Sequence, residues 1–423
     1  MAAKFRLARV WTRPTAVVAL LMALLSFMYL GYVLNPDKNL HDFPLALVNQ
    51  DVGDSLGGNP ANIGDQISAA LVQHIPADKV DLKVTGVPEM QRMLLDGSIY
   101  GAIIIPSDFT KRLGILGTAS VVEGQIERPI ITIQTNPRVG SYATQITTRI
   151  AQQALTEVNR TVGKQLTDTV EAQLHSAPGA VAPTVAGASL LTLAEPINVV
   201  ITPFRPLPEG TGGGLSAFFY TLLVLLAGFT GAMIIHTMVD ASLGFTPTEY
   251  GPWYVHYPPT PISRFRTLLL KWGILTGLAP VVSAIILGVG NLLGMPVDRA
   301  PALFLYSTLA IIAVGVSALA ILAAFGAAGM LVNLIVFIVL GLPSAGGTVP
   351  IEATPRFMGW LSTFEPMHQV FLGIRAILYF DARGSAGLAH GTWMTLLGLA
   401  IGVCFGAVVT LFYDRKGLER KAN

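Results

Sequence analysis

The sequence predicts an α-helical membrane protein with six transmembrane helices and a large mixed α/β extracytoplasmic domain between the first and second of them. Three observations lead to this prediction. Of 423 residues, 52% are hydrophobic and only 12% are charged, and the mean hydropathy is +0.59, whereas soluble domains carry about 25% charged residues. The hydrophobic residues are concentrated in blocks of about 20, the length that crosses a bilayer core of about 30 Å. A long polar stretch, residues 35–214, separates the first block from the others.

The first predicted span covers residues 15–34. It follows a segment, residues 1–14, whose basic side chains belong to Lys4, Arg6, Arg9 and Arg13. A cleaved signal peptide would also place basic residues before an apolar run. This run is longer than a typical signal-peptide core, however, and no A-x-A cleavage site follows Leu34. We therefore expect an uncleaved membrane anchor.

The other five predicted spans lie within residues 215–413. One covers residues 215–239, one follows Lys271 and ends near Met295, and one covers residues 392–413. The segment between residues 299 and 352 has no charged side chain between its ends. It is long enough for two spans, and we expect the connection near residues 326–329.

The basic residues predict the orientation, because short cytoplasmic flanks carry an excess of Lys and Arg. One basic cluster precedes the first span, a second precedes the third, and a third, in residues 414–423, follows the last. With six spans, all three clusters fall on one side. We therefore expect both termini to be cytoplasmic and residues 35–214 to lie outside.

The insert has the alternating pattern of a mixed α/β domain. Short runs rich in Val, Ile and Leu predict strands at residues 44–49, 80–84, 101–105 and 130–134. Between them, helices are expected at residues 63–74, 88–95 and 107–113, the last with Ser107 as its N-cap.

A long amphipathic helix is predicted from Tyr142 to Leu174, where apolar residues recur every three to five positions. It can pack on its own domain, which we favour, or extend from the membrane or pair with another subunit. Residues 177–187 (APGAVAPTVAG) are typical of a turn-rich linker. Residues 209–214 (EGTGGG) predict a flexible lead into the second span.

Recognisable catalytic chemistry is absent from the sequence. It contains no phosphate-binding G-x-x-x-x-G-K-[ST] loop, no H-E-x-x-H and no G-x-S-x-G. The only cysteine is Cys404, and the seven histidines are scattered. A net charge of +2 gives no field that would hold a nucleic acid. We expect no enzymatic activity, no cofactor, no metal site and no nucleic-acid partner.

The predicted spans are also poor in ionisable groups. His236, Asp240, Lys271 and Trp272 fall at predicted span ends, where snorkelling and interfacial anchoring would explain them. Ion-driven transporters usually keep such groups near mid-membrane, so their scarcity argues against ion coupling. Asn291 and Asn333 are expected to form hydrogen bonds between helices.

Two connecting segments remain. The predicted cytoplasmic loop, residues 240–266, is rich in proline and aromatic residues. It is either an interfacial loop or a docking surface for a cytoplasmic partner, formed by Trp253, Tyr254, Tyr257, Arg264 and Arg266. On the outside, residues 344–381 contain two short amphipathic pieces that are too polar to span. We expect them to be interfacial or re-entrant helices.

Several motifs give the chain a resemblance to a known family. PLALVNQDVG (44–53), LLDGSIYGAIIIPSDFTKRL (94–113) and TNPRVG (135–140) are similar to ectodomain motifs of that family. LPSAGGTVPIEATP (342–355) and EPMHQVFLGIR (365–375) are similar to its segments after the fifth span. The chain therefore resembles membrane subunits of ABC-2 type transporters, especially the YhgE/Pip-like branch, which is itself similar to fungal nitrosoguanidine-resistance proteins. The matching ectodomain residues are Asn49, Asp51, Gly53, Tyr100, Gly101, Pro106 and Phe109.

The resemblance implies a permease subunit of an exporter, working as a homodimer among membrane lipids. In such systems a separate ATPase drives transport, and the missing nucleotide loop fits either a partner ATPase or none. The resemblance also implies an external gate, for which the candidate residues are Pro343, Gly346, Gly347, Pro350, Pro366 and Arg375. With so few charges in the spans, a hydrophobic, lipid-like or drug-like substrate is expected. The alternatives are a scaffold or receptor whose ectodomain binds cell-surface partners or phage, and an ion-coupled transporter.

Overall fold

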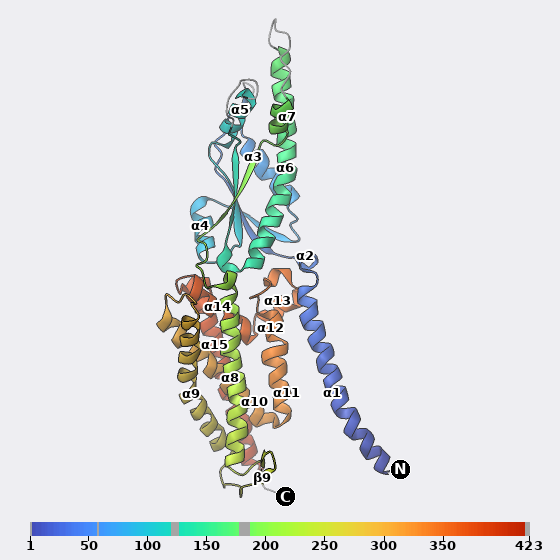
Figure 1. The fold of residues 1–423 in the computed structure, drawn as a ribbon, viewed down its shortest axis with the longest axis vertical. Coiled ribbons are helices and arrows are strands. Elements are labelled where there is room, and N and C mark those ends of the chain that lie inside the picture. The colour runs from blue at the N-terminus through green and yellow to red at the C-terminus, as the bar shows by residue number, and fades with distance from the viewer. Residues whose placement is uncertain (1, 57–58, 120–126, 177–186, 419–423) are drawn as a thin grey trace. The chain divides into compact units, whose positions relative to one another are not determined.

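The computed structural model describes residues 2–56, 59–119, 127–176 and 187–418 (Figure 1). The chain divides into two compact units. We call residues 1–39 and 208–423 the membrane unit, and residues 40–207 the α/β unit. The linker predicted at 177–187 lies almost wholly outside the described residues.

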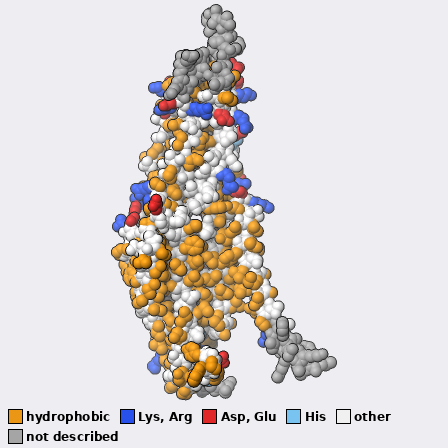
Figure 2. All heavy atoms as spheres, viewed as in Figure 1, with side chains coloured by type: hydrophobic (Ala, Val, Ile, Leu, Met, Phe, Trp, Pro, Cys, Tyr) orange, Lys and Arg blue, Asp and Glu red, His pale blue; other side chains and the backbone are white. Residues whose placement is uncertain are grey.

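Five helices of the membrane unit are long and apolar enough to cross a bilayer, so the chain is an integral membrane protein. They are α1 (Ala2–Val33), α8 (Leu215–Ser242), α9 (Arg264–Leu292), α10 (Ala300–Phe325) and α15 (Ala389–Arg415). On the face shown in Figure 2, hydrophobic side chains cover most of this unit.

The remaining predicted span is a shorter apolar segment, Ala328–Ser344. It consists of α11 (Ala328–Leu334), a π-helical turn η3 (Ile335–Val339) and α12 (Gly341–Ser344). The break before it was predicted correctly, because α10 ends at Phe325 and Gly326 has a φ of 59°. Five of the six predicted spans therefore have the length and composition of a membrane-crossing helix.

Helix α10 is the central helix and packs against α8, α9 and α15. Small residues allow the close approach that is typical of helices in membranes. A Cβ added at Gly402 of α15 would lie 3.0 Å from the Cα of Ser317 of α10. The Asn333 side chain donates to the Ala318 carbonyl at 3.1 Å, as expected of an amide between helices. Asn291, in contrast, is exposed near the end of α9.

Helix α1 contacts the rest of the membrane unit through its second half. Met28 packs with Val339, Met358 and Leu361. The Tyr29 hydroxyl donates to the Ile338 carbonyl at 3.0 Å. Toward the N-terminus α1 diverges from α11 (Figure 1).

Between α12 and α15 the chain forms short helices. They are η4 (Ile351–Ala353), α13 (Arg356–Ser362), α14 (Pro366–Tyr379) and the π turn η5 (Gly384–Leu388). α13 and α14 are the two short helical pieces that the sequence predicted here. Elsewhere the unit has a short helix α2 (Pro36–Asn39) and a hairpin of β8 (Thr248–Tyr250) and β9 (Trp253–Val255).

The α/β unit has a five-stranded sheet in the order β4-β1-β5-β6-β7. Its strands are β1 (Phe43–Asn49), β4 (Val80–Val84), β5 (Gly101–Ile105), β6 (Ile130–Thr135) and β7 (Asn198–Pro203). The pairs are parallel except β5 with β6, which are antiparallel. A small hairpin of β2 (Asp54–Leu56) and β3 (Asn59–Ala61) follows β1.

The helices of this unit are α3 (Ile63–His74), α4 (Val87–Leu95), α5 (Phe109–Ala119), α6 (Ser141–Ser176) and α7 (Gly187–Ala194). α5 begins two residues after the predicted N-cap, Ser107. The long helix α6 buries Ile146, Val158 and Leu166 and contacts α3, α5 and α7. It therefore packs on its own unit, as the favoured interpretation expected.

Candidate functional site

An ion pair lies inside the membrane unit between α8 and α9. Lys271 Nζ is 2.6 Å from Asp240 Oδ1, and the two side chains are 3% and 5% exposed. His236 precedes Asp240 by one helical turn, so both side chains point from the same face of α8. The Nδ1 atom of His236 is 3.0 Å from Lys271 Nζ, and its Nε2 atom is 3.3 Å from Asp240 Oδ2. The three side chains form a closed triangle, which we call the charged triad.

The burial of the charged triad corrects the expectation that these residues are interfacial anchors. Helix α9 begins at Arg264, where the Ser263 side chain accepts the N–H of Arg266 as an N-cap. Lys271 is thus two turns inside the helix rather than in front of it. Trp272 is also buried, and its indole N–H donates to the Val316 carbonyl at 3.2 Å. Buried ionisable groups in a membrane protein mark a functional site by default.

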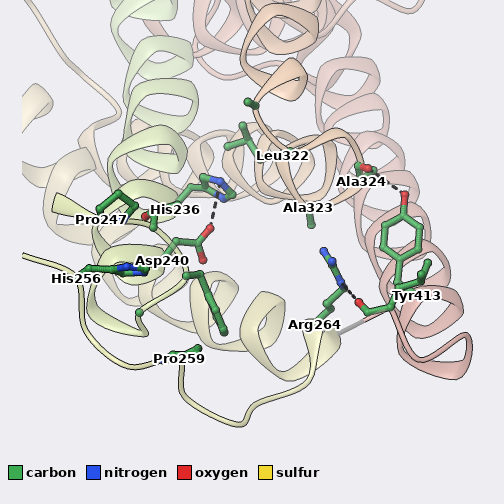
Figure 3. Close-up of a pocket in the computed structure, with 16 residues that line it drawn as sticks. His236, Asp240, Pro247, His256, Pro259, Arg264, Leu322, Ala323, Ala324 and Tyr413 are labelled. Carbon is green, nitrogen blue, oxygen red and sulfur yellow. Dashed lines mark hydrogen bonds and ion pairs between the residues drawn. The ribbon is translucent and has the colours of Figure 1, made fainter. Parts of the chain in front are cut away.

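A cavity of about 750 Å³ adjoins the charged triad. Figure 3 shows His236 and Asp240 on one side of it and Arg264 and Tyr413 on the other. Its remaining walls come from the loop after α8, including His256, and from the end of α10. The cavity thus combines a buried charge cluster with further polar and cationic groups from two other elements.

Contacts with α15 fix the position of Arg264 at this cavity. The Asp414 carboxylate accepts the backbone N–H groups of Arg264 and Phe265 at 2.8 and 3.0 Å. The Arg264 guanidinium donates to the Leu418 carbonyl at 2.6 Å and lies 5.4 Å from the centre of the Tyr413 ring. Arg264 is therefore a structural link between α9 and α15.

The five residues of the predicted docking loop therefore fall into two groups. Arg264 lines the cavity, whereas Trp253, Tyr254, Tyr257 and Arg266 are exposed. Trp253 and Tyr254 belong to β9 of the hairpin and are 72% and 62% exposed. The structure does not bring them together with the charged triad at the cavity wall.

A second cavity, of about 200 Å³, is largely apolar and lies among α10, η3, α14 and α15. Val314, Phe337, Val370 and Ile401 contribute to its walls. Gln369, which is 3% exposed, is its notable polar residue. Its Nε2 donates to the Ser362 and Thr363 carbonyls at 2.8 and 3.1 Å. Among the residues that the structure describes, none donates to its buried Oε1. We call this cavity the Gln369 pocket.

A buried acid that sequence reasoning missed, Glu365, directly precedes the predicted gate residue Pro366. Glu365 is 2% exposed and caps α14, since its Oε2 accepts the N–H groups of Met367 and His368 at 2.7 and 3.3 Å. Burial raises the pKa of Glu365 to about 8. Burial also lowers the pKa of His368 to about 4, and His368 Nδ1 is 2.9 Å from the Ala345 carbonyl. Both groups are therefore uncharged near neutral pH. The sequence feature that could have pointed to Glu365 is its place directly before Pro366, where it caps the start of a helix.

The gate glycines are required by close contacts. Gly346 has a φ of 73°, a conformation that favours glycine. A Cβ at Gly347 would overlap the ring of Phe218 on α8, at 2.9 Å from Phe218 Cβ. Pro343 and Pro350 are buried, and Pro366 begins α14. The Arg375 guanidinium lies 5.5 and 5.7 Å from the centres of the Phe371 and Phe380 rings.

The residues of the predicted ectodomain motif have a structural role in the α/β unit. Asp51, which is 8% exposed, accepts the N–H groups of Gly64 at 2.9 Å and Thr110 at 3.1 Å, and also the Thr110 hydroxyl. These groups lie at the N-termini of α3 and α5, where the helix dipoles favour a carboxylate. Asn49 accepts the N–H of Asp51 at 3.1 Å.

The remaining motif residues support the same region of the α/β unit. Gly53 has a φ of 74° in the turn after Asp51. The Tyr100 and Phe43 rings pack edge to face at 4.9 Å, Phe109 is fully buried and Pro106 precedes α5. Gly101 allows close approach of its backbone to Gln134 and Thr147. The motif therefore joins strands to helices.

Comparisons with known proteins complete the description. A domain of a putative ABC type-2 transporter from Thermotoga maritima is similar at 15% identity, over 38% of this chain and 85% of that one, with a TM-score of 0.23. Likeness at that score carries no argument about function. No curated protein matches the chain. The family described as "Protein of unknown function (DUF3533)" matches residues 15–409. Because this match takes in nearly the whole sequence, the chain belongs to the DUF3533 family.

Proposed function

We propose that this protein is the membrane subunit of an ABC-2-like exporter that moves hydrophobic or lipid-like molecules, including drugs, out of the cell. The observation that carries the proposal is the Gln369 pocket. Ligand sites are typically apolar cavities in which a few polar groups fix the orientation. Here the walls would hold an apolar body, and the buried Gln369 Oε1, to which no described residue donates, would accept one hydrogen bond from a ligand that reaches it. The substrate class is therefore an apolar molecule with an N–H or O–H donor.

Residues 343–375 carry all of the predicted gate residues, and we call them the gate segment. This segment supports export because it adjoins the same pocket. Gln369 and Pro366 belong to α14 and line the pocket. Glu365 caps the same helix, and His368 holds its first turn to the end of α12 through the Ala345 carbonyl. Movement of α14 would change the pocket and the gate together. In the proposed topology this end of the membrane unit faces outward and both termini are cytoplasmic.

The partners belong to the proposal as well. The exposed aromatic side chains of the β8–β9 hairpin would dock a separate ATPase, because the sequence has no nucleotide-binding loop of its own. A second copy of the chain would complete the pathway, as in ABC-2 systems. The motifs shared with the YhgE/Pip-like branch support this plan, and a bacterial cytoplasmic membrane would contain it.

A non-transporting scaffold or receptor is the second candidate. The observation that favours it is the size and order of the α/β unit, which has its own five-stranded sheet and hydrophobic core. Such a unit would suit recognition of a cell-surface partner or phage. It predicts no movement of apolar molecules by the membrane unit.

Efflux of N-phenyl-1-naphthylamine, an apolar fluorophore with one N–H donor, tests the proposal. The informative variant is Gly398→Leu, because Gly398 lines the Gln369 pocket and its Cβ position has no atom within 4 Å. The matched control is Gly277→Leu on α9, which also has an open Cβ position and does not line the pocket. Bacterial cells expressing the wild type or the control should lose the preloaded probe faster than cells expressing Gly398→Leu. Equal loss from all three, at equal expression, would reject export through this pocket.

A further inference from the structure

We propose that the charged triad of His236, Asp240 and Lys271 is a proton-binding site that powers movement of α8 against α9. Its coupling to transport rests on the export function proposed above, whereas proton binding itself does not. The site takes one proton from water in the adjoining cavity. Energy would then come from a proton gradient, in addition to or in place of a partner ATPase.

A charged Lys271 sets the protonation state of the closed triangle, because an ammonium group only donates hydrogen bonds. The Lys271 ammonium donates to Asp240 Oδ1 and to His236 Nδ1, so Nδ1 must be an acceptor. The imidazole proton is therefore on Nε2, which lies 3.3 Å from Asp240 Oδ2. A neutral histidine joins a cation and an anion, and the three groups together carry no net charge.

Adding a proton opens this arrangement. When a hydronium ion in the cavity gives its proton to His236 Nδ1, a water molecule remains and the imidazole becomes an imidazolium. Nδ1 can then no longer accept from Lys271, and two cations face each other across 3.0 Å in a buried place. Like charges at that distance repel strongly where water is scarce. The Lys271–His236 contact between α9 and α8 is lost, so that the Lys271–Asp240 pair alone links the two helices here, and the contact forms again when the proton leaves.

Protons reach the charged triad from the cavity. The His236 side chain is 20% exposed, whereas those of Asp240 and Lys271 are almost fully buried. Other titratable or charged groups around this cavity are His256 from the loop, Arg264 from α9 and Tyr413 from α15, with Asp414 bonded behind Arg264. The part of α10 that lines it, Leu322–Ala324, has no ionisable side chain. His236 is therefore the group of the triad through which a proton from the cavity enters.

Helix α8 connects this site with the gate segment. At its opposite end, the Ser216 hydroxyl is 2.7 Å from the Tyr379 hydroxyl of α14, and Phe218 packs against Gly347. One continuous helix of 28 residues joins both contacts. A shift of α8 at the charged triad would therefore move α14 and change the Gln369 pocket.

The variant that tests the site is His236→Gln. Glutamine can accept from Lys271 and donate to Asp240, so the triangle stays closed, but it cannot bind the proton. His256→Gln is the matched control, because His256 lines the same cavity outside the triad. Hydrogen exchange of full-length protein, corrected for intrinsic rates, is measured between about pH 5 and 8, where imidazoles titrate. In the wild type and in the control, the end of α8 and the start of α9 should lose protection severalfold on acidification. His236→Gln should keep its protection throughout.

The coupling is measured in vesicles of phosphatidylethanolamine and phosphatidylglycerol, without ATP. An imposed proton gradient should raise the rate of N-phenyl-1-naphthylamine movement severalfold in the wild type and in His256→Gln, but not in His236→Gln. A wild-type exchange profile independent of pH would reject the proton site. A pH-dependent profile without probe movement in any protein would reject proton-driven transport and keep the site, and the cellular efflux assay described above would then decide whether export occurs at all. Probe movement equally fast with and without the gradient would reject the coupling.

Discussion

The hydroxyl of Tyr379 lies 2.7 Å from Ser216 Oγ and also accepts the backbone N–H of Ala217 at 3.3 Å. These bonds hold α14, which forms part of the Gln369 pocket, to the first turn of α8. The first residues of α8 follow a glycine-rich segment in which Gly212, Gly213 and Gly214 all have positive φ. Tyr379 therefore fixes the position of the first turn of α8, which the preceding glycines do not constrain.

Tyr379→Phe removes the hydroxyl and keeps the packing of the ring. We expect a loss of about 1 kcal/mol in the free energy of unfolding, the usual net value of a buried hydrogen bond. The measurement is the thermal unfolding midpoint of purified protein. Tyr250→Phe is the control, because Tyr250 is 70% exposed and should leave the midpoint unchanged. Equal midpoints for both variants would show that the hydroxyl contributes nothing.

Because the pKa of Glu365 is raised in the folded protein, we expect the free energy of unfolding to fall as the pH rises. The pKa of Glu365 is about 8 in the folded protein, above the ordinary value of 4.5, so the folded state binds more protons in that interval. His368, with a folded pKa of about 4 and an ordinary value of 6.5, acts in the opposite direction below pH 6.5. The net fall should appear between pH 6.5 and 8, with a limiting slope of about 1.4 kcal/mol per pH unit.

The measurement is the unfolding midpoint across that interval for the wild type and Glu365→Gln. The glutamine can still cap α14 through its carbonyl oxygen, but it does not titrate. We expect its midpoint to vary much less with pH than that of the wild type. Parallel curves for the two proteins would contradict a protonated Glu365.

Asp51→Asn should destabilise the α/β unit. An amide nitrogen would face the donors at the N-termini of α3 and α5 that the carboxylate now accepts. Hydrogen bonds to a charged group contribute about 1.5–3 kcal/mol. Hydrogen exchange of α3 and α5 in the full chain should rise, whereas Asp54→Asn, at an exposed position in β2, should leave it unchanged. Unchanged protection in Asp51→Asn would refute this structural role.

Gly347→Ala should impair efflux through a clash with Phe218. The added Cβ leaves the protein expressed but displaces α8 from the gate segment. Phe218→Ala in the same chain removes the clashing ring and should restore part of the efflux. Gly359→Ala is the control, since its Cβ would lie at an ordinary 3.5 Å from Ile351. If the double variant transports no better than Gly347→Ala, the contact does not explain the defect.

Local patterns predicted much of the α/β unit. α3 and β4 have the predicted bounds because their apolar periodicity is regular, and Asn62 caps α3. β7 was missed. It is a short β-branched run between Pro196 and Pro203, and its partner β6 is distant in sequence, so pairing rather than local propensity establishes it.

The membrane site was less predictable. The start of the span predicted to follow Lys271 was placed too late, because hydropathy marks apolar content, whereas the Ser263 cap marks where α9 begins. That error turned a buried ion pair into an apparent interfacial anchor. Gln369 gave no sequence signal, because its importance comes from walls contributed by several helices.

The most direct test of export compares N-phenyl-1-naphthylamine with its N-methyl analogue, which has no hydrogen-bond donor. Efflux of both probes is measured in cells expressing the wild type or Gln369→Leu. We predict that the wild type prefers the N–H probe, because Gln369 Oε1 accepts its hydrogen bond, and that Gln369→Leu loses this preference while still moving apolar molecules. Equal rates for the two probes in the wild type, or the same preference in both proteins, would contradict it.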